Sequence, residues 1–331
     1  MPHDIDFSTG KPAIAYVGET PWHELGEKLP EHAPIEAWIK AAGLDWELKR
    51  LPVQYFFDAK LRVMDDRFVL SRSDTGTALS VVSGDYHIVQ PKEILEFYRD
   101  LVTSFGYSLE TAGALNGGRK VWALANTGKA ALVHSGKDPD EIGAYVLLAT
   151  SCDKTLATTI AFTSIRVVCQ NTLSFAQDDI AKNKRPQLKV PHSLRFDPDR
   201  VKTTLGLIDK AWTTFSDTVR KLAERPLEES AASSFFEKLL LQKDDKGLSA
   251  RARREHTSIM SLYESAPGQN LDTAKGTLWG VVNAVSYYVD HVRSVGGGDR
   301  LDSAWFGAGG ALKDKAWAAA CDLLNQSPAT P

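Results

Sequence analysis

At 331 residues the chain exceeds the usual size of one domain, so we expect at least two substructures. A composition of 43% hydrophobic and 24% charged residues is ordinary for a globular protein and can fill a real core. The net charge of −3 counts against a protein that simply coats DNA, although the distribution of charge along the chain matters more than the total.

The three cysteines, Cys152, Cys169 and Cys321, are an odd number and show no CxxC spacing. They therefore predict buried apolar residues in a reducing compartment, with no disulfide and no zinc site. The N-terminus lacks the basic and apolar regions of a signal peptide, and no apolar segment is long enough to span a membrane. We expect a cytoplasmic protein with no membrane partner, no metal and no other cofactor.

The N-terminal region, residues 1–90, predicts a loop, a short helix and a β-meander. The loop contains Trp22 and His23, for which packing is a better interpretation than metal binding, because no second ligand lies at a suitable spacing. The helix is expected over Pro34 to Gly43. The candidate strands are 46–51, 53–58, 61–64, 68–71 and 78–82, with turns at 65–66, 73–76 and 83–85.

Residues 91–180 predict an α+β core. A helix over 91–105 precedes a hairpin of 107–115 and 120–126, and a polar connector over 129–141 leads to a doubly buried strand from Gly143 to Thr150. Residues 155–160 resume in β-branched residues. The spacing of apolar residues from Ile165 to Leu173 then predicts a helix whose outer surface carries Arg166, Gln170 and Asn171. An arginine and two amides would suit phosphates, bases or another protein chain.

Residues 181–202 form a segment whose centre is purely basic and whose prolines keep it out of a long helix. Such a segment can contact several phosphates, or it can serve as a solvated linker between domains, and the two interpretations are compatible. Its candidate phosphate-binding residues are Lys182, Lys184, Arg185, Lys189 and Arg195.

The C-terminal region, residues 203–331, predicts a helical domain. Flexible loops are expected at the glycine-rich stretches 296–298 and 305–310. The expected helices, the first of which begins inside the linker, are 201–222, 228–241, 250–263, 273–292 and 314–324. The fold class is therefore α+β, an antiparallel sheet with packed helices followed by a helical C-terminal region.

Four stretches of the chain together resemble the bacterial phage/plasmid-like protein family, a domain of unknown function carried by mobile elements. The stretches are 15–23, 166–173, 277–291 and 303–307. The resemblance implies a setting near DNA metabolism and brings no established activity. In element order, residues 91–176 also resemble the β-β-β-α core of single-strand annealing proteins of the Erf and Rad type.

The leading hypothesis is a single-stranded DNA-binding protein that promotes annealing in homologous recombination, as a homo-oligomeric ring or filament. Arg166 and the five candidate residues of the basic segment would bind phosphates, while Gln170 and Asn171 would contact bases or a neighbouring subunit. The alternative is a non-enzymatic interaction protein of a mobile element that binds a host protein. No nucleophile, zinc or nuclease motif is present, so no catalytic residues are predicted.

Overall fold

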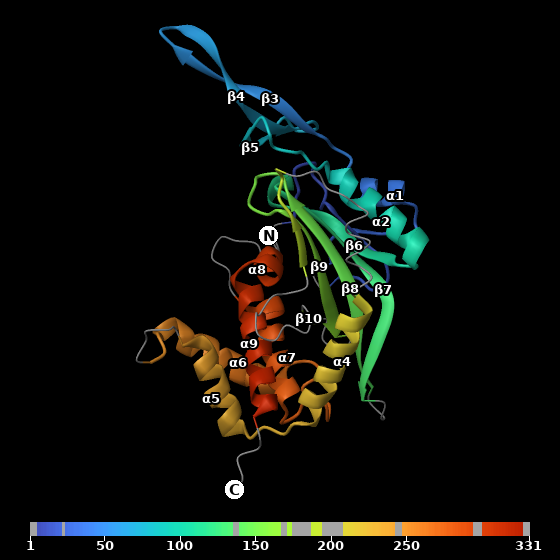
Figure 1. The fold of residues 1–331 in the computed structure, drawn as a ribbon, viewed down its shortest axis with the longest axis vertical. Helices are drawn as coiled ribbons and strands as arrows, with labels where there is room; N and C mark the ends of the chain where they lie inside the picture. The colour runs from blue at the N-terminus through green and yellow to red at the C-terminus, as the bar shows by residue number, and fades with distance from the viewer. Residues whose placement is uncertain are drawn as a thin grey trace. The chain divides into compact units, whose positions relative to one another are not determined.

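The computed structural model describes residues 5–21, 24–134, 139–166, 171–173, 187–193, 208–241, 247–293 and 300–326. The fold is α+β, with antiparallel sheets and most of the helices in the C-terminal region, as the sequence predicts (Figure 1). The chain divides into two compact units. Unit 1 comprises residues 1–128, 145–162 and 187–206, and unit 2 comprises 129–144, 163–186 and 207–331. The boundaries predicted near residues 90, 180 and 202 stay predictions.

The large sheet has eight strands in the order β10-β9-β8-β7-β6-β1-β2, with β11 also pairing with β9. β8 is buried along almost its whole length, which confirms the doubly buried strand predicted from Gly143 to Thr150. It begins earlier, however, and β7 extends to His134, so the polar connector predicted over 129–141 is wrong. The strands are β1 Ile14–Tyr16, β2 Glu27–Lys28, β6 Ser108–Leu115, β7 Lys120–His134, β8 Asp140–Ser151, β9 Thr158–Arg166, β10 Asn171–Leu173 and β11 Gln187–Val190.

Helix α2 (Pro91–Phe105) is held on this sheet by a buried tyrosine. The Tyr98 hydroxyl lies 2.9 Å from the carbonyl oxygen of Ala123 on β7 and 3.0 Å from that of Val146 on β8. Burial raises the pKa of Tyr98, so its hydroxyl stays protonated and keeps a proton to donate. A second helix, α1 (Ile35–Ala41), packs beside α2 and confirms the short amphipathic helix predicted from Pro34.

A β-meander is present as predicted, but where the sequence predicts five shorter strands it has three, in the order β3-β4-β5. They are β3 Leu48–Phe57, β4 Lys60–Arg72 and β5 Ala78–Ser83. Because β5 pairs only with Arg67 to Ser71, the remainder of the β3–β4 hairpin extends beyond β5 as a two-stranded ribbon (Figure 1).

The turn of this hairpin lies at Asp58 and Ala59, whose φ angles are 49° and 58°. Two consecutive positive φ angles are typical of the tight turns that match the twist of antiparallel strands. The turn predicted at Asp65-Asp66 is wrong, because both residues lie within β4. Val53 pairs with Met64 whereas Pro52 pairs with Phe68, so three residues of β4 bulge out at that point.

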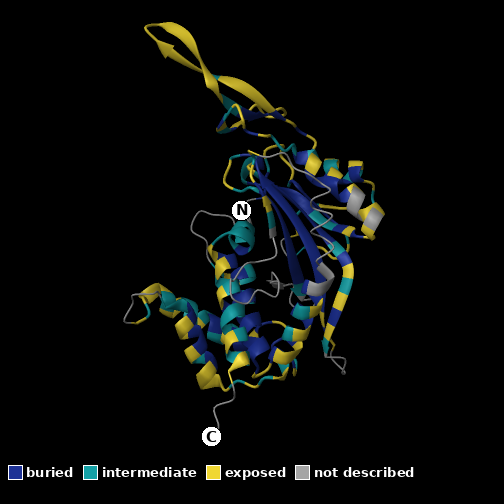
Figure 2. Cartoon of the chain, in the orientation of Figure 1, coloured by how far each residue is buried: buried dark blue, intermediate teal, exposed yellow. Residues whose placement is uncertain are grey.

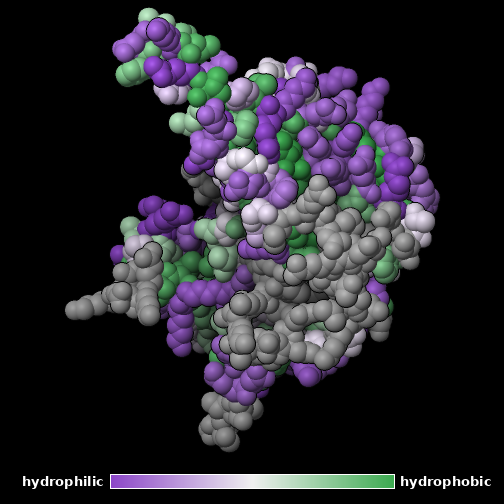
Figure 3. All heavy atoms as spheres, turned by 45° about the horizontal axis from the view of Figure 1, so that its top comes forward, coloured by the Kyte–Doolittle hydropathy of each residue, from purple (hydrophilic) through white to green (hydrophobic). Residues whose placement is uncertain are grey.

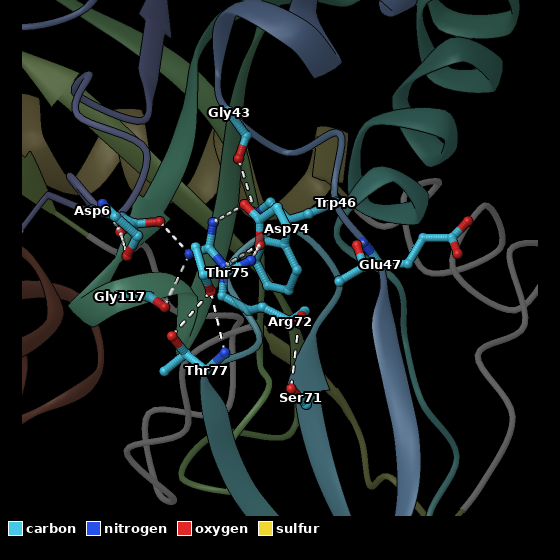
Figure 4. Close-up of polar contacts among 12 residues, drawn as sticks. Asp6, Gly43, Trp46, Glu47, Ser71, Arg72, Asp74, Thr75, Thr77 and Gly117 are labelled. Carbon is cyan, nitrogen blue, oxygen red and sulfur yellow. Dashed lines mark hydrogen bonds and ion pairs between the residues drawn. The ribbon is translucent and has the colours of Figure 1, made fainter.

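The root of the hairpin is fixed by Arg72, the last residue of β4 (Figure 4). The guanidinium forms an ion pair with Asp6, and both side chains are almost fully buried, at 1% and 2% exposure. Two further donors bind the Asp74 carboxylate at 3.0 and 2.7 Å, and Nη1 donates to the Gly117 carbonyl at 3.0 Å. The guanidinium also stacks 4.2 Å from the ring centroid of Trp46.

These contacts keep Arg72 charged, and the space that they occupy requires a glycine at position 118. Burial disfavours the charged guanidinium, but hydrogen bonds to Asp74 and Asp6 outweigh it and raise the pKa of Arg72. The hydrogen bonds from Arg72 lower the pKa of the Asp74 carboxyl in turn. Gly118, with φ at +85°, has no room for a side chain, since a Cβ there would lie 2.6 Å from the guanidinium.

The helix predicted from Ile165 to Leu173 is wrong where the structure describes it. β9 continues to Arg166, and Asn171–Leu173 forms β10, which pairs antiparallel with β9. A short apolar run fits both the helical and the strand period, so the period alone does not distinguish the two structures. The residues before Ile165 are largely β-branched or aromatic, which favours the strand that the structure shows. Cys169 lies outside the described residues.

Unit 2 contains the C-terminal helices, and the buried helix α7 lies among them. α8 and the start of α9 occupy the stretch 305–310, so the flexible loop predicted there is wrong. The α-helix observed here is shorter than the one predicted over 273–292. Thr277 caps its N-terminus, and from Tyr288 to Val292 the α-helix gives way to a π-helical turn. The helices are α4 Ile208–Glu224, α5 Glu229–Leu240, α6 Ala250–Ser265, α7 Leu278–Tyr287, α8 Arg300–Phe306 and α9 Ala308–Asn325.

Unit 2 also buries polar groups in matched pairs. The Asp140 carboxylate accepts a hydrogen bond of 2.6 Å from Thr273, and Lys313 forms a 2.7 Å ion pair with Asp290. None of the helices in the described part of the chain is both long and apolar enough to cross a membrane.

Replacing Arg72 by methionine should lower the stability of unit 1 strongly, because it leaves the Asp6 carboxylate buried without its cation. We expect a loss of about 3 kcal/mol or more in the free energy of unfolding, measured as a shift of the thermal midpoint. Arg67→Met is the matched control on the same strand, because its ion pair with Asp66 is exposed and should contribute less than about 1 kcal/mol. Equal shifts for the two variants would contradict the role of Arg72.

Candidate nucleic-acid interface

The structure describes three of the eight residues predicted to bind DNA. Arg166 ends β9 and pairs with Asn171 at the start of β10, so they are neighbours across two strands rather than on one helix. Lys189 lies on β11 in unit 1, whereas Arg166 and Asn171 belong to unit 2. The other five lie outside the described residues: Gln170, Lys182, Lys184, Arg185 and Arg195.

The described part of the basic segment includes a strand of the large sheet. β11 pairs antiparallel with the first half of β9, and this register sets Lys189 opposite Thr159. The Lys189 side chain is exposed while its neighbour Val190 is buried, as expected for a strand with one face on the core. Pairing of β11 fixes the backbone of Lys189 on the sheet and leaves its ammonium exposed to solvent, which is compatible with the phosphate-binding interpretation at this position.

His192 anchors the end of β11. Its ring stacks on Tyr86, with centroids 4.6 Å apart and planes inclined by 18°. The ring nitrogen Nδ1 lies 3.2 Å from the His87 carbonyl oxygen, and Nε2 lies 3.2 Å from that of Leu156. The His87 amide in turn donates to the His192 carbonyl at 2.6 Å. These contacts fix the direction in which Lys189 leaves the sheet.

A second candidate surface is the end of the β3–β4 hairpin, residues 53–64, which we call the arm. Every residue of the arm except Val53 is exposed (Figure 2). Directly opposed residues of antiparallel strands share a face, so the register divides the arm into two faces. One face carries Val53, Tyr55, Phe57, Lys60, Arg62 and Met64, and the other carries Gln54, Phe56, Leu61 and Val63.

The first face combines aromatic rings with cations, and we call it the cation–aromatic face. Tyr55 is 46% exposed and Phe57 is 55% exposed. The Arg62 guanidinium lies 5.3 Å from the centroid of the Phe57 ring, within the range of a cation–π interaction. None of its six strand positions holds an acidic residue. Hydrophobic and hydrophilic residues lie side by side at the end of the arm in Figure 3.

The second face carries no charge, and we call it the apolar face. Phe56 is 76% exposed, Leu61 is 54% exposed and Val63 is 49% exposed. Three large apolar side chains together on a solvated ribbon are typical of a surface that meets another molecule. The acidic residues of the hairpin lie elsewhere, with Asp58 in the turn and Asp65 and Asp66 in the bulge of β4.

The sequence analysis missed the arm as a candidate surface, although the sequence carries a signal for it. From Val53 to Met64 eight of the twelve positions are apolar or aromatic, and the consecutive rings of 55–57 place aromatic side chains on both faces of the strand. A strand covered on both sides by a core has this pattern, and so does a ribbon that binds through its surface.

The described residues show little that would suit a metal or a nucleophile. In the ranges that the structure covers, no three of the His, Cys, Asp and Glu side chains gather as metal ligands would. Burial raises the pKa of the Cys152 thiol to about 12, so this thiol is protonated at neutral pH.

The fold and these surfaces describe an α+β protein with a helical unit and an exposed hairpin. Residues 78–306, more than half of the chain, match the family described as "Domain of unknown function (DUF932)". The chain therefore belongs to that family, and the arm precedes the matched residues. No curated protein and no solved structure matches the chain.

Replacing His192 by alanine should loosen β11, because the ring contacts to Tyr86, His87 and Leu156 are lost. A hydrogen bond contributes about 1 kcal/mol, so amide exchange in residues 187–190 should quicken about fivefold or more. His256→Ala is the control, since this histidine contacts Ser233 in unit 2. Hydrogen–deuterium exchange that is unchanged in β11 would show that the ring does not hold the strand.

Proposed function

We propose that this protein binds single-stranded DNA and promotes the annealing of complementary strands in homologous recombination on a phage or plasmid. The observation that carries the proposal is the exposed cation–aromatic face of the arm. Proteins that bind single strands without sequence preference combine a positively charged surface with aromatic rings on which bases stack. Tyr55, Phe57, Lys60 and Arg62 supply both parts on one face of one ribbon.

The spacing of the two rings suits annealing. Tyr55 and Phe57 are two residues apart on β3, and a strand rises about 3.3 Å per residue, so their backbone positions are about 6.6 Å apart. Stacked bases in a duplex are about 3.4 Å apart. Two bases resting on the two rings would therefore be separated from each other, with their hydrogen-bonding edges free to meet a complementary strand.

The cations of the arm would bind the phosphates of a single strand whose bases stack on the two rings. Lys60 lies opposite Phe57 and Arg62 opposite Tyr55, so each ring has a cation beside it for the adjoining phosphate. Lys189 on β11 adds a further cation in unit 1, and the remaining predicted phosphate contacts are Arg166 at the end of β9 and four residues of the basic segment. A few local cations of this kind can bind a nucleic acid even though the net charge of the chain is −3.

Two resemblances support the setting. The stretches shared with phage/plasmid-like proteins suggest a mobile element, and α2, the β6–β7 hairpin and β8 follow the first part of the order expected of an annealing core, although strands β9 and β10 stand where its closing helix is predicted. Family membership by itself adds no activity, because the matched family is one of unknown function.

The second candidate function is a non-enzymatic interaction protein that binds a host protein. One observation favours it, namely the uncharged apolar face formed by Phe56, Leu61 and Val63. Apolar surface of this kind makes no specific contact with phosphates, whereas it suits the centre of a protein–protein interface.

Fluorescence anisotropy with labelled single-stranded DNA tests the leading proposal. Tyr55→Ala and Phe57→Ala should each weaken binding about tenfold, because each removes a stacking platform. The double variant Lys60→Ala/Arg62→Ala should reduce the slope of log K against log salt by about 1.4, which corresponds to two lost phosphate contacts.

Phe56→Ala is the matched control for these variants, since its ring lies on the apolar face of the same ribbon. The proposal predicts that this control binds DNA as the unmodified protein does. Absence of binding at low salt, or equal losses for Phe56→Ala and Phe57→Ala, would overturn it.

A further inference from the structure

The outer edge of β4 is open along the arm. β3 pairs with one side of β4, and β5 pairs with the other side only from Arg67 to Ser71. Among the described residues no strand pairs with the outer edge from Lys60 to Asp66. The backbone amides and carbonyls of that edge are therefore available to another strand.

The arm also lacks support from its own chain. A two-stranded hairpin on its own is at best marginally stable in water, and three strands or a covered face are needed for independent stability. Here both faces and the β4 edge are exposed, and they include several large apolar side chains. An additional strand on the open edge would extend the ribbon into a sheet.

The charges along this edge identify the partner. Two cations, Lys60 and Arg62, lie near the tip, and two carboxylates, Asp65 and Asp66, lie in the bulge, where Asp66 also forms an exposed ion pair with Arg67. This order is self-complementary when the edge meets a second copy of itself in the antiparallel direction. With Val63 opposite Val63, the register places Lys60 of each copy opposite Asp66 of the other.

We propose that the arms of two copies of this chain pair through their β4 edges, antiparallel and centred on Val63, to form a continuous four-stranded sheet. Such a contact is isologous, so it closes as a two-fold dimer. A ring or a filament would require a second, different interface. The two Lys60–Asp66 pairs, one at each end of the new strand pair, would favour this register.

This arrangement has a consequence for the cation–aromatic face. Opposed residues share a face, so the two copies present their cation–aromatic faces on the same side of the combined sheet. The dimer would offer two rows of aromatic rings next to each other. The dimer itself is inferred from the strand edge and its charges, and it does not depend on nucleic-acid binding.

The edge fits a second copy better than it fits DNA. Two carboxylates next to each other repel a phosphate backbone, whereas in an antiparallel pair of arms Asp66 lies opposite Lys60 of the other copy. A contact centred one residue nearer the tip would set Arg62 opposite Arg62 of the other copy, so like-charge repulsion disfavours that register.

Charge-swapped variants of the full chain test this contact by sedimentation velocity at micromolar concentration, in nucleic-acid-free protein. The acidic-arm variant is Lys60→Asp/Arg62→Asp, and the basic-arm variant is Asp65→Lys/Asp66→Lys. We expect the unmodified protein to be a dimer, each variant alone to be a monomer, and an equimolar mixture of the two to form a heterodimer. The variant that carries all four changes should dimerise again.

Circular dichroism and the thermal midpoint establish that the variants fold, which is expected because the changed side chains are exposed. Val63→Pro, which removes an edge donor at the centre of the contact, should also give a monomer. A monomeric unmodified protein, dimers that persist in the variants, or a mixture that stays monomeric would overturn the inference. A monomer that still binds single-stranded DNA would overturn the inference alone and leave the proposed function standing.

Discussion

The buried ion pair of Arg72 with Asp6 is the contact on which the arrangement of unit 1 depends. Arg72 is the last residue of β4 in the three-stranded sheet. Its partners Asp6 and Gly117 belong to segments beside the large sheet, so one guanidinium joins the two sheets. Removing a buried charge from its partner costs several kcal/mol, which makes this joint difficult to rearrange. The arm therefore starts from a fixed root, although its tip has no support from the described chain.

The arm is anchored at its root by a buried ion pair and exposed at its tip, a combination that suits a surface for binding another molecule. Exposed apolar strands are a liability for a soluble chain, because open edges pair with other strands. The arm combines that liability with charges that limit how pairing can occur, cations near the tip and carboxylates near the bulge. The aromatic rings stay exposed on one face, where cations lie beside them. Both properties would serve a molecule that presents bases in an ordered row.

The sequence predicts those parts of the fold that depend on local pattern. The apolar run of β8 and the amphipathic stripe of α2 are found where their periods indicate, because burial and periodicity are recorded in neighbouring residues. Arg72 could not be assigned in this way, since its partner Asp6 lies 66 residues away and only the fold brings them together. Ile165 and Leu173 fit a helical period, but the two ends of this stretch pair with each other as the antiparallel strands β9 and β10. Of the candidate site, the basic segment could be predicted as a phosphate-binding candidate from its composition. The arm could not be predicted in this way, because it forms around a turn at Asp58-Ala59, and an Asp-Ala pair is a weak sequence indicator of a tight turn.

The most direct test of the account is ultraviolet crosslinking of single-stranded DNA to the full chain, followed by mass spectrometry of the crosslinked peptides. Aromatic rings in contact with bases crosslink readily, so the account predicts adducts on the arm, at Tyr55 or Phe57, that a high salt concentration suppresses. Adducts confined to the helices of unit 2, or no adducts under conditions in which the DNA is bound, would contradict the claim that the arm is the DNA-binding surface.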